Sequence, residues 1–294
     1  MSGLAHDELR ELALLYRQTA ADLSTAREHR ADARLARHLN HLLGRAHNLI
    51  YSGQPARPRG IVSFYTSTFP QTFRATWQYS LAATVLFLIG AIVGSGLSLA
   101  DPGFQRFMLG GPMIDTIERR EMWTHGIVTI KPLASSAILT NNLSVAFAAF
   151  AMGVTAGLGT AWMMILNGLL IGVVATACFQ AGLSLSLWSF VAPHGSLELP
   201  AIFIAGGAGL ILGRGLLDPG MLPRREALSE SGGRAIRLLL GVIPMLVVAG
   251  VIEGFISPVA IPPAPKFVIG AALLILLVLY LTRAGRPATA VPVP

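Results

Sequence analysis

The chain has 294 residues, of which 53% are hydrophobic and 13% are charged, and its formal net charge is +7. A soluble domain carries about 25% charged residues, so this composition excludes an ordinary soluble globular protein. The positive charge flanks apolar segments and forms no basic patch interleaved with aromatic residues, so we expect no nucleic-acid partner. The single cysteine, Cys178, excludes a disulfide within the chain and a cysteine-based metal site.

Residues 1–60 are predicted to form a soluble helical head in the cytoplasm. Residues 1–77 contain ten arginines and six acidic residues, whereas later charges fall in short clusters. Apolar residues recur at helical spacing in two runs, Leu9, Leu12, Tyr16 and Leu23, then Leu35, Leu39, Leu42 and Ile50. Pro55 and Pro58 end this pattern. The simplest structure is a helical hairpin, and one long helix is the alternative.

Residues 61–78 form a short amphipathic segment with five aromatic residues, which we expect to lie on the bilayer surface. Beyond it, apolar stretches approach the about 20 residues that a helix needs to cross a bilayer. The expected spans are 79–99, 136–159, 161–183, 200–217, 236–256 and 267–283. Together they predict an all-α, polytopic transmembrane helix bundle of about six spans over residues 79–283. Residues 284–294 are expected to be a disordered cytoplasmic tail.

The distribution of basic residues predicts the orientation in the membrane. The head, residues 213–237 and the tail carry ten, five and two basic residues. On the opposite side, residues 99–135, 184–199 and 257–266 carry four, none and one. This positive-inside bias predicts a multi-pass protein of the cytoplasmic membrane with both termini in the cytoplasm. Lys266 and Arg283, which bound the last span, are expected to snorkel to the interfaces.

Two features suggest surfaces for partners. Residues 101–131 are too polar to span and too long for a turn, so we expect one or two interfacial helices on the external face. They either pack as a lid on the bundle or bind a partner. Pairs of glycines four residues apart, such as Gly90 with Gly94 and Gly168 with Gly172, allow close helix packing. Such packing makes a homodimer plausible in addition to contacts within the chain.

Polar residues inside apolar segments are the candidate functional residues. Asn141 and Asn142 begin an apolar stretch, and Asn167 lies within the next one. A buried amide is costly unless it is hydrogen-bonded, so these side chains cap a helix, join two helices or line a polar site.

Two acids and a histidine give the stronger signal. His194 and Glu198 are four residues apart, so they share one face if the helix begins before them. Glu253 lies inside the outer end of the fifth predicted span, and acids in such positions are functional candidates by default. In the predicted topology Glu198, Glu253 and the asparagine pair all fall near the external leaflet.

Three interpretations of this polar group remain open. It is a structural network, a proton or cation site used in transport, or a hydrolytic centre in which His194 and Glu198 act as acid–base groups or metal ligands. The sequence lacks the second histidine of a HExxH site and shows no Ser–His–Asp or Cys–His set. We therefore predict no enzyme activity, catalytic residue, resident metal or cofactor from the sequence.

Several motifs resemble the stage II sporulation protein M family. They are Asn141–Phe147, Gly157–Thr160, Asn167 with Gly168, His194–Ala201 and Glu253–Ser257. Leu15–Arg17 and His47–Tyr51 are similar to the head of its longer bacterial members. The resemblance implies a membrane scaffold, because the founding member recruits peptidoglycan-degrading proteins for forespore engulfment.

The leading hypothesis is therefore a non-enzymatic scaffold of a cell-envelope or peptidoglycan-remodelling complex, and an ion- or proton-coupled transporter or permease is the alternative. The expected partners of the protein are the lipid bilayer, other envelope membrane proteins and a second copy of the chain.

Overall fold

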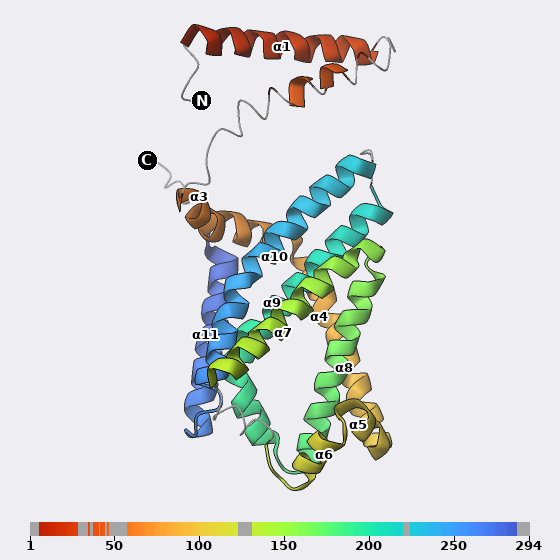
Figure 1. Ribbon diagram of the computed structural model, residues 1–294, viewed down its shortest axis with the longest axis vertical. Coiled ribbons are helices and arrows are strands. Elements are labelled where there is room, and N and C mark those ends of the chain that lie inside the picture. The colour runs from red at the N-terminus through yellow and green to blue at the C-terminus, as the bar shows by residue number, and fades with distance from the viewer. Residues whose placement is uncertain are drawn as a thin grey trace, which may run out of the picture. The chain divides into compact units, whose positions relative to one another are not determined.

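The computed structural model describes residues 6–28, 35, 38–40, 42–44, 46, 58–122, 131–219 and 224–286 (Figure 1). These residues form helices and turns and no strand, which confirms the predicted all-α class. The chain divides into two compact units, residues 1–63 and 64–294.

The first unit contains α1 (His6–Glu28) and α3 (Pro58–Ser63). Between them, the described positions from 35 to 46 are also helical. The turn of the predicted hairpin was expected around residues 28–32, of which all but Glu28 lie outside the described residues, so the hairpin stays a prediction.

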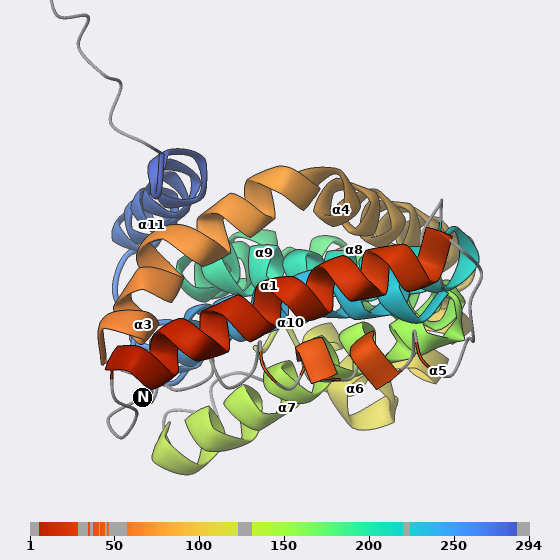
Figure 2. The same ribbon diagram turned by 90° about the horizontal axis from the view of Figure 1, so that it is seen from above.

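The second unit contains the apolar helices. Its elements are η1 (Phe64–Thr68), α4 (Phe69–Ala100), α5 (Pro102–Leu109), α6 (Gly111–Glu118), α7 (Lys131–Ala151), η3 (Met152–Thr155), α8 (Leu158–Gln180), α9 (Ser184–Leu217), α10 (Arg224–Phe255) and α11 (Pro263–Arg283). Seen from above, α9 lies in the middle, with α4 and α11 on one side and α7 and α10 on the other (Figure 2).

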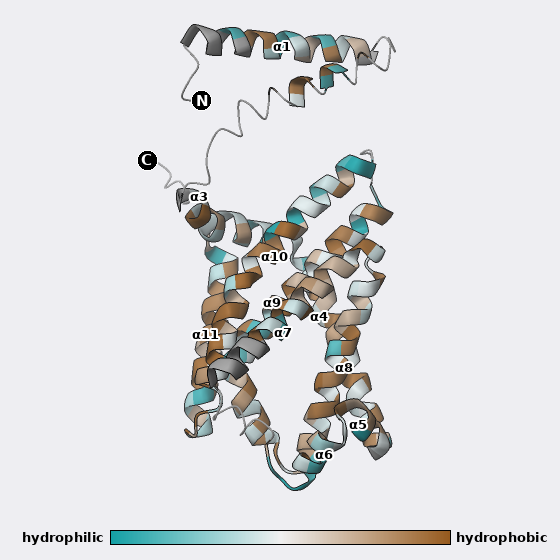
Figure 3. Ribbon diagram, in the orientation of Figure 1, coloured by the Kyte–Doolittle hydropathy of each residue, from teal (hydrophilic) through white to brown (hydrophobic). Residues whose placement is uncertain are grey.

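Five helices of the described chain are long and apolar enough to cross a membrane, namely α4, α8, α9, α10 and α11. A sixth apolar helix, Leu139–Thr155, is shorter. Hydrophobic residues cover these helices, and hydrophilic residues gather toward the ends of the bundle (Figure 3). The structure therefore supports a membrane bundle, with five of the six predicted spans meeting the length expected of a crossing helix.

The first half of α9 differs from the prediction. Residues 184–199 were expected to be an external loop, yet they are the beginning of a 34-residue helix. Pro193 and Pro200 lie inside this helix. Proline removes one N–H donor and favours a bend, but a membrane helix tolerates it where neighbouring groups satisfy the freed carbonyls. Within this stretch the hydroxyl of Ser196 also donates to the Pro193 carbonyl at 3.0 Å.

The boundary between α7 and α8 also differs from the predicted span limits. Ala156 and Gly157 have φ values of 56° and 83°, so the chain turns there and α8 begins at Leu158. The Gly159 N–H donates to the Thr155 hydroxyl at 2.8 Å, which satisfies one free donor at the start of α8. The predicted second span, residues 136–159, therefore includes this turn and the start of α8.

The first and last described helices of the second unit meet at one end of the bundle. The Tyr280 hydroxyl donates to the Tyr65 carbonyl at 2.5 Å, and Arg74 donates to the Leu281 carbonyl at 2.8 Å. Non-helical backbone at Thr76 kinks α4 just after these contacts. The kink falls near the expected boundary between the interfacial segment and the first span, and the interfacial position of that segment stays a prediction.

At the opposite end, α5 and α6 occupy the segment for which one or two helices were expected. Ile114 and Ile117 of α6 are 4% and 2% exposed, and they pack in one cluster with Cys178 of α8 and Leu187 of α9. The side chain of Asp101 accepts a hydrogen bond from the Gly103 N–H at 2.8 Å and caps α5. Residues 123–130 lie outside the described chain.

Candidate functional site

The candidate site lies between α9 and α10, toward the α5–α6 end of the bundle. His194 and Glu198 are one turn apart on α9, and Glu253 comes from the last turn of α10. One possible ligand atom from each side chain lies within 4.8 Å of the others. The structure thus brings together the three residues that gave the strongest signal in the sequence, and it does so because α9 begins early enough to place His194 in the helix.

Burial separates these three side chains from bulk solvent. The side chains of His194 and Glu253 are 7% and 13% exposed, and the His194 Nε2 and Glu253 Oε1 atoms are 3.9 Å apart. One carboxylate oxygen of each glutamate, Oε2 of Glu198 and Oε2 of Glu253, is buried and has no hydrogen-bond partner among the described residues. Buried carboxylate oxygens are costly without a partner, so this arrangement requires a proton or a cation.

The imidazole of His194 is held on two sides. Its Nδ1 atom lies 2.9 Å from the Ser257 hydroxyl, just beyond the end of α10. The Phe190 ring, one turn earlier on α9, packs edge-on against it with a centroid separation of 5.4 Å. If Nδ1 carries the proton, the hydrogen bond to Ser257 leaves the lone pair of Nε2 facing the Glu253 carboxylate.

Lys266 adds a buried positive charge near this group. Its side chain is 7% exposed, and its ammonium donates to the Ser257 carbonyl at 2.7 Å. The ammonium thus has a partner within the protein, and its expected snorkelling to the interface stays a prediction. The chain that links α10 to α11 supplies this carbonyl oxygen.

The asparagines do not join this group by hydrogen bonds in the structure. Asn141 donates to the Asn142 side chain at 3.4 Å, and Asn142 is 7% exposed. Asn167 donates to the Met163 carbonyl of its own helix at 2.8 Å. Asn167 thus satisfies its amide locally, and the asparagine pair forms its own contact on α7.

Three cavities are lined by described residues. The one nearest the site has a volume of about 650 Å³ and is lined by residues that include Arg120, Ser189, Phe190, Ser257 and Lys266. Because Phe190 and Ser257 both hold the His194 ring, this cavity reaches the wall of the site.

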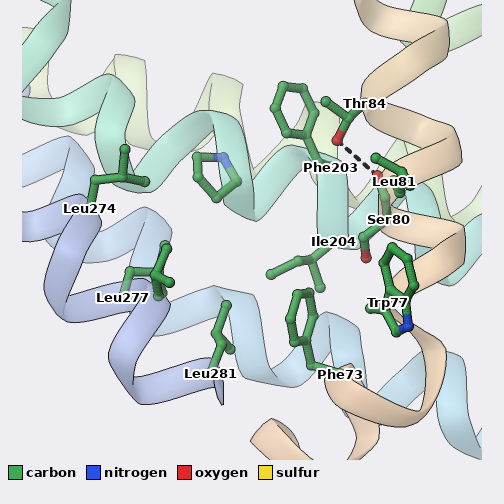
Figure 4. Close-up of a pocket in the computed structure, with 12 residues that line it drawn as sticks. Phe73, Trp77, Ser80, Leu81, Thr84, Phe203, Ile204, Leu274, Leu277 and Leu281 are labelled. Carbon is green, nitrogen blue, oxygen red and sulfur yellow. Dashed lines mark hydrogen bonds between the residues drawn. The ribbon is translucent and has the colours of Figure 1, made fainter. Parts of the chain in front are cut away.

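The other two cavities lie elsewhere. A cavity of about 230 Å³ at the opposite end is lined by Thr76, Tyr79, Arg214, Asp218 and Arg234, among others. An apolar groove of about 260 Å³ runs between α4, α9 and α11, and Figure 4 shows Trp77, Phe203 and Leu277 around it. Neither cavity has a residue of the His194 group in its lining.

Sequence reasoning missed Ser257 and the buried role of Lys266. Both residues follow the apolar part of α10, where a serine, several prolines and a lysine indicate only a loop and a helix start. Two signals were available for Ser257, its proximity to Glu253 and its place in the Glu253–Ser257 motif, and neither reveals that the hydroxyl turns back toward α9.

Comparison with known protein families gives a match that covers most of the bundle and the site. Residues 83–258 match the model of a family described as stage II sporulation protein M, and this match includes the three residues of the site. Residues 1–52 match a domain of unknown function. No solved structure matches the chain.

A relative from Methanocaldococcus jannaschii is described as an uncharacterized protein. It is 34% identical over 127 residues, which cover 42% of this chain and 70% of the relative. Since the family match covers more than half of the chain, the resemblance noted in the sequence is confirmed. The protein therefore belongs to the stage II sporulation protein M family.

Proposed function

We propose that the protein is a non-enzymatic scaffold in the cytoplasmic membrane that organises a cell-envelope or peptidoglycan-remodelling complex. Membership of the family supports a membrane protein of this kind. The distribution of basic residues supports cytoplasmic termini, and the contacts between η1 and α11 place both ends of the second unit at the same end of the bundle.

The observation that carries the proposal is the closed interior of the bundle. The two polar cavities lie at opposite ends. Between the helices α9 and α10, the core contains fully buried apolar side chains such as Ile204, Leu238 and Leu246. A close-packed apolar core favours a fixed platform for other proteins over a conduit for solutes.

The α5–α6 segment offers a contact surface for partners on the external side. Phe107 of α5 is 82% exposed, although α6 is anchored by its buried isoleucines. Arg106 next to it pairs with Asp115 at 2.8 Å and with Glu118 at 3.7 Å. An exposed aromatic ring beside paired charges on an anchored segment suits a protein–protein contact, in which aromatic residues and arginine are enriched.

Site-specific photo-crosslinking in native membranes tests this proposal. A photoreactive residue at Phe107 is expected to capture a protein of the cell envelope. The matched control is Ile92, which is 72% exposed in the apolar part of α4 and should capture lipid. If position 107 also captures only lipid, while the purified protein carries solute flux in liposomes, the scaffold proposal is wrong.

A second candidate, an ion- or proton-coupled permease, is favoured by the buried group of His194, Glu198 and Glu253. Acidic residues that lie inside a bundle and next to a polar cavity occur on ion pathways. In proteoliposomes, this function predicts flux that depends on an ion or pH gradient and is lost in Glu253→Gln. Glu230→Gln, an exposed substitution on the same helix, is the control and should retain the flux. Gradient-independent or absent flux in the unmodified protein would exclude this candidate.

A further inference from the structure

The group formed by His194, Glu198 and Glu253 has the composition of a metal site. It offers one imidazole nitrogen and two carboxylates from two neighbouring helices, with a ligand atom of each within 4.8 Å of the others. Three protein ligands of this kind are common in sites that hold a divalent transition metal and keep a further position open.

The two buried carboxylates leave room for a cation in the charge balance of the site. Each glutamate has one buried oxygen without a hydrogen-bond partner among the described residues. The nearby ammonium of Lys266 is directed to the Ser257 carbonyl, and no ion pair joins it to either glutamate within 4.0 Å in the described chain. A cation between the carboxylates would supply the charge that the protein itself does not place there.

The histidine is oriented as a metal ligand requires. The contact of 2.9 Å between Nδ1 and the Ser257 hydroxyl fixes the ring and, with the proton on Nδ1, leaves Nε2 free to coordinate. A hydrogen bond from the second ring nitrogen is the usual companion of a metal-bound histidine, because it sets the tautomer and the direction of the ligand.

The distances fit a bound ion after a small movement. Zn–N and Zn–O bonds of about 2.0–2.2 Å in a tetrahedral site separate two ligand atoms by about 3.4 Å. The Nε2 atom of His194 and Oε1 of Glu253 are 3.9 Å apart, so rotation of the glutamate side chain is enough to close this pair. Glu198 lies one helical turn from His194, where both side chains reach the same point.

We propose that His194, Glu198 and Glu253 bind one divalent transition-metal ion of the Zn²⁺ class and thereby join α9 to α10. The imidazole ligand favours such an ion over Mg²⁺ and Ca²⁺, which take oxygen ligands. The cavity beside Ser257 and Lys266 is the route by which the ion enters. The proposal depends on neither the scaffold nor the permease function.

Metal binding by the purified full-length protein in lipid nanodiscs tests the proposal. After treatment with a chelator and its removal, titration with ZnCl₂ is expected to reach one ion per chain. Co²⁺ should bind in its place and give the visible absorption of a four- or five-coordinate centre. Excess Mg²⁺ or Ca²⁺ should displace neither ion.

Matched variants link the binding to these residues. Glu198→Gln and Glu253→Gln keep the side-chain shape and should each weaken Zn²⁺ binding at least tenfold, whereas Glu230→Gln on the exposed face of α10 should leave it unchanged. Ser257→Ala removes the hydrogen bond to the ring and should weaken binding by about 10-fold.

If a variant fails to fold, the binding measured with the unmodified protein can still contradict the proposal. Absence of saturable Zn²⁺ and Co²⁺ binding to the unmodified protein contradicts it and leaves protons as the partners of the carboxylates. Equal binding by Glu253→Gln and the unmodified protein, or displacement of Zn²⁺ by Mg²⁺, contradicts it as well. Loss of the Co²⁺ absorption in the two glutamate variants, with Glu230→Gln unaffected, supports it.

Discussion

The helix pairs α4–α8 and α9–α10 are both held together inside the bundle, but by different means. In the first pair, glycines bring the two backbones into contact. A Cβ atom at Gly168 would overlap the Phe87 carbonyl, and one at Gly90 would overlap the Ile165 carbonyl. In the second pair, large apolar side chains such as Leu238 and Leu246 fill the core, and His194 with the glutamates lies at one end.

Close backbone packing and the polar group therefore occur in different helix pairs. Without a hydrophobic drive between helices in lipid, close backbone approach is one way to gain van der Waals contact, and it leaves no room for a polar site. Larger apolar side chains fill the interface of α9 and α10, and three polar side chains lie at one end of it. The substitutions below test this contrast, from the largest expected effect to the smallest.

The largest effect is expected for Gly168→Val. The added side chain meets backbone atoms of α4, which cannot move aside as a flexible side chain does, so the free energy of unfolding should fall by more than about 3 kcal/mol. Unfolding in mixed micelles followed by circular dichroism measures this change. Gly96→Ala is the control, because a Cβ atom there meets nothing within 4 Å. Equal stability of the two variants would show that the glycine contacts are not what holds α4 to α8.

The second effect concerns metal removal at the α9–α10 interface. If the proposed ion is bound, Zn²⁺ at a hundred times its Kd should raise the free energy of unfolding by about 2.7 kcal/mol relative to protein in chelator. The thermal midpoint in nanodiscs with Zn²⁺ and with chelator measures the difference. Glu253→Gln should lose this response while Gly96→Ala keeps it. An identical response of the Glu253 variant would place the ion elsewhere.

A smaller effect is expected for Ser257→Ala. The variant loses the hydroxyl contact with His194 but keeps the carbonyl that binds Lys266, so the free energy of unfolding should fall by about 1 kcal/mol. The comparison is Ser189→Ala, which lies on the wall of the same cavity and bonds only within its own helix, to Ser186 at 3.0 Å. Chemical denaturation of both variants shows whether the contact between helices contributes more to the free energy of unfolding than the local bond does.

The smallest effect is expected for Asp218→Asn, at the other end of α9. Its carboxylate lies 3.6 Å from Arg214, and the two side chains are 64% and 60% exposed. Water and salt screen an exposed pair, so the thermal midpoint should shift less in Asp218→Asn than in Ser257→Ala. The midpoint of Asp218→Asn should also stay the same when salt is added. A larger shift would mean that this end of the bundle depends on its charges as much as the buried site does.

Much of the architecture could be predicted from the sequence because it follows from local patterns. Long apolar segments of α4, α8 and α10 are readable from composition alone, since a bilayer imposes a minimum length on a crossing helix. The glycine spacing of α4 and α8 correctly indicated close packing, and the structure places it between these helices of one chain. Where local signals were mixed, as in residues 184–199 with Pro193 inside them and Pro200 directly after them, the prediction of a loop was wrong.

The candidate site could be predicted only in part. His194, Glu198 and Glu253 stood out because charged and imidazole groups are rare in apolar segments. Asn142 and Asn167 stood out for the same reason, yet their hydrogen bonds lie within the asparagine pair and within α8. Residue type marks a polar group as costly to bury, but it does not say which neighbour satisfies it.

The sequence by itself determined that the chain is a helical membrane protein of a recognisable family, because hydrophobicity, charge bias and short motifs are properties of consecutive residues. Only the tertiary structure decided that Glu253 approaches His194 from another helix. It also decided that the Ser257 hydroxyl contacts the His194 ring and that Lys266 donates to the Ser257 carbonyl. These contacts join residues 59 and 63 positions apart or depend on a turn after α10, and the direction of a side chain across a helix interface is set by packing and not by the pattern along the chain.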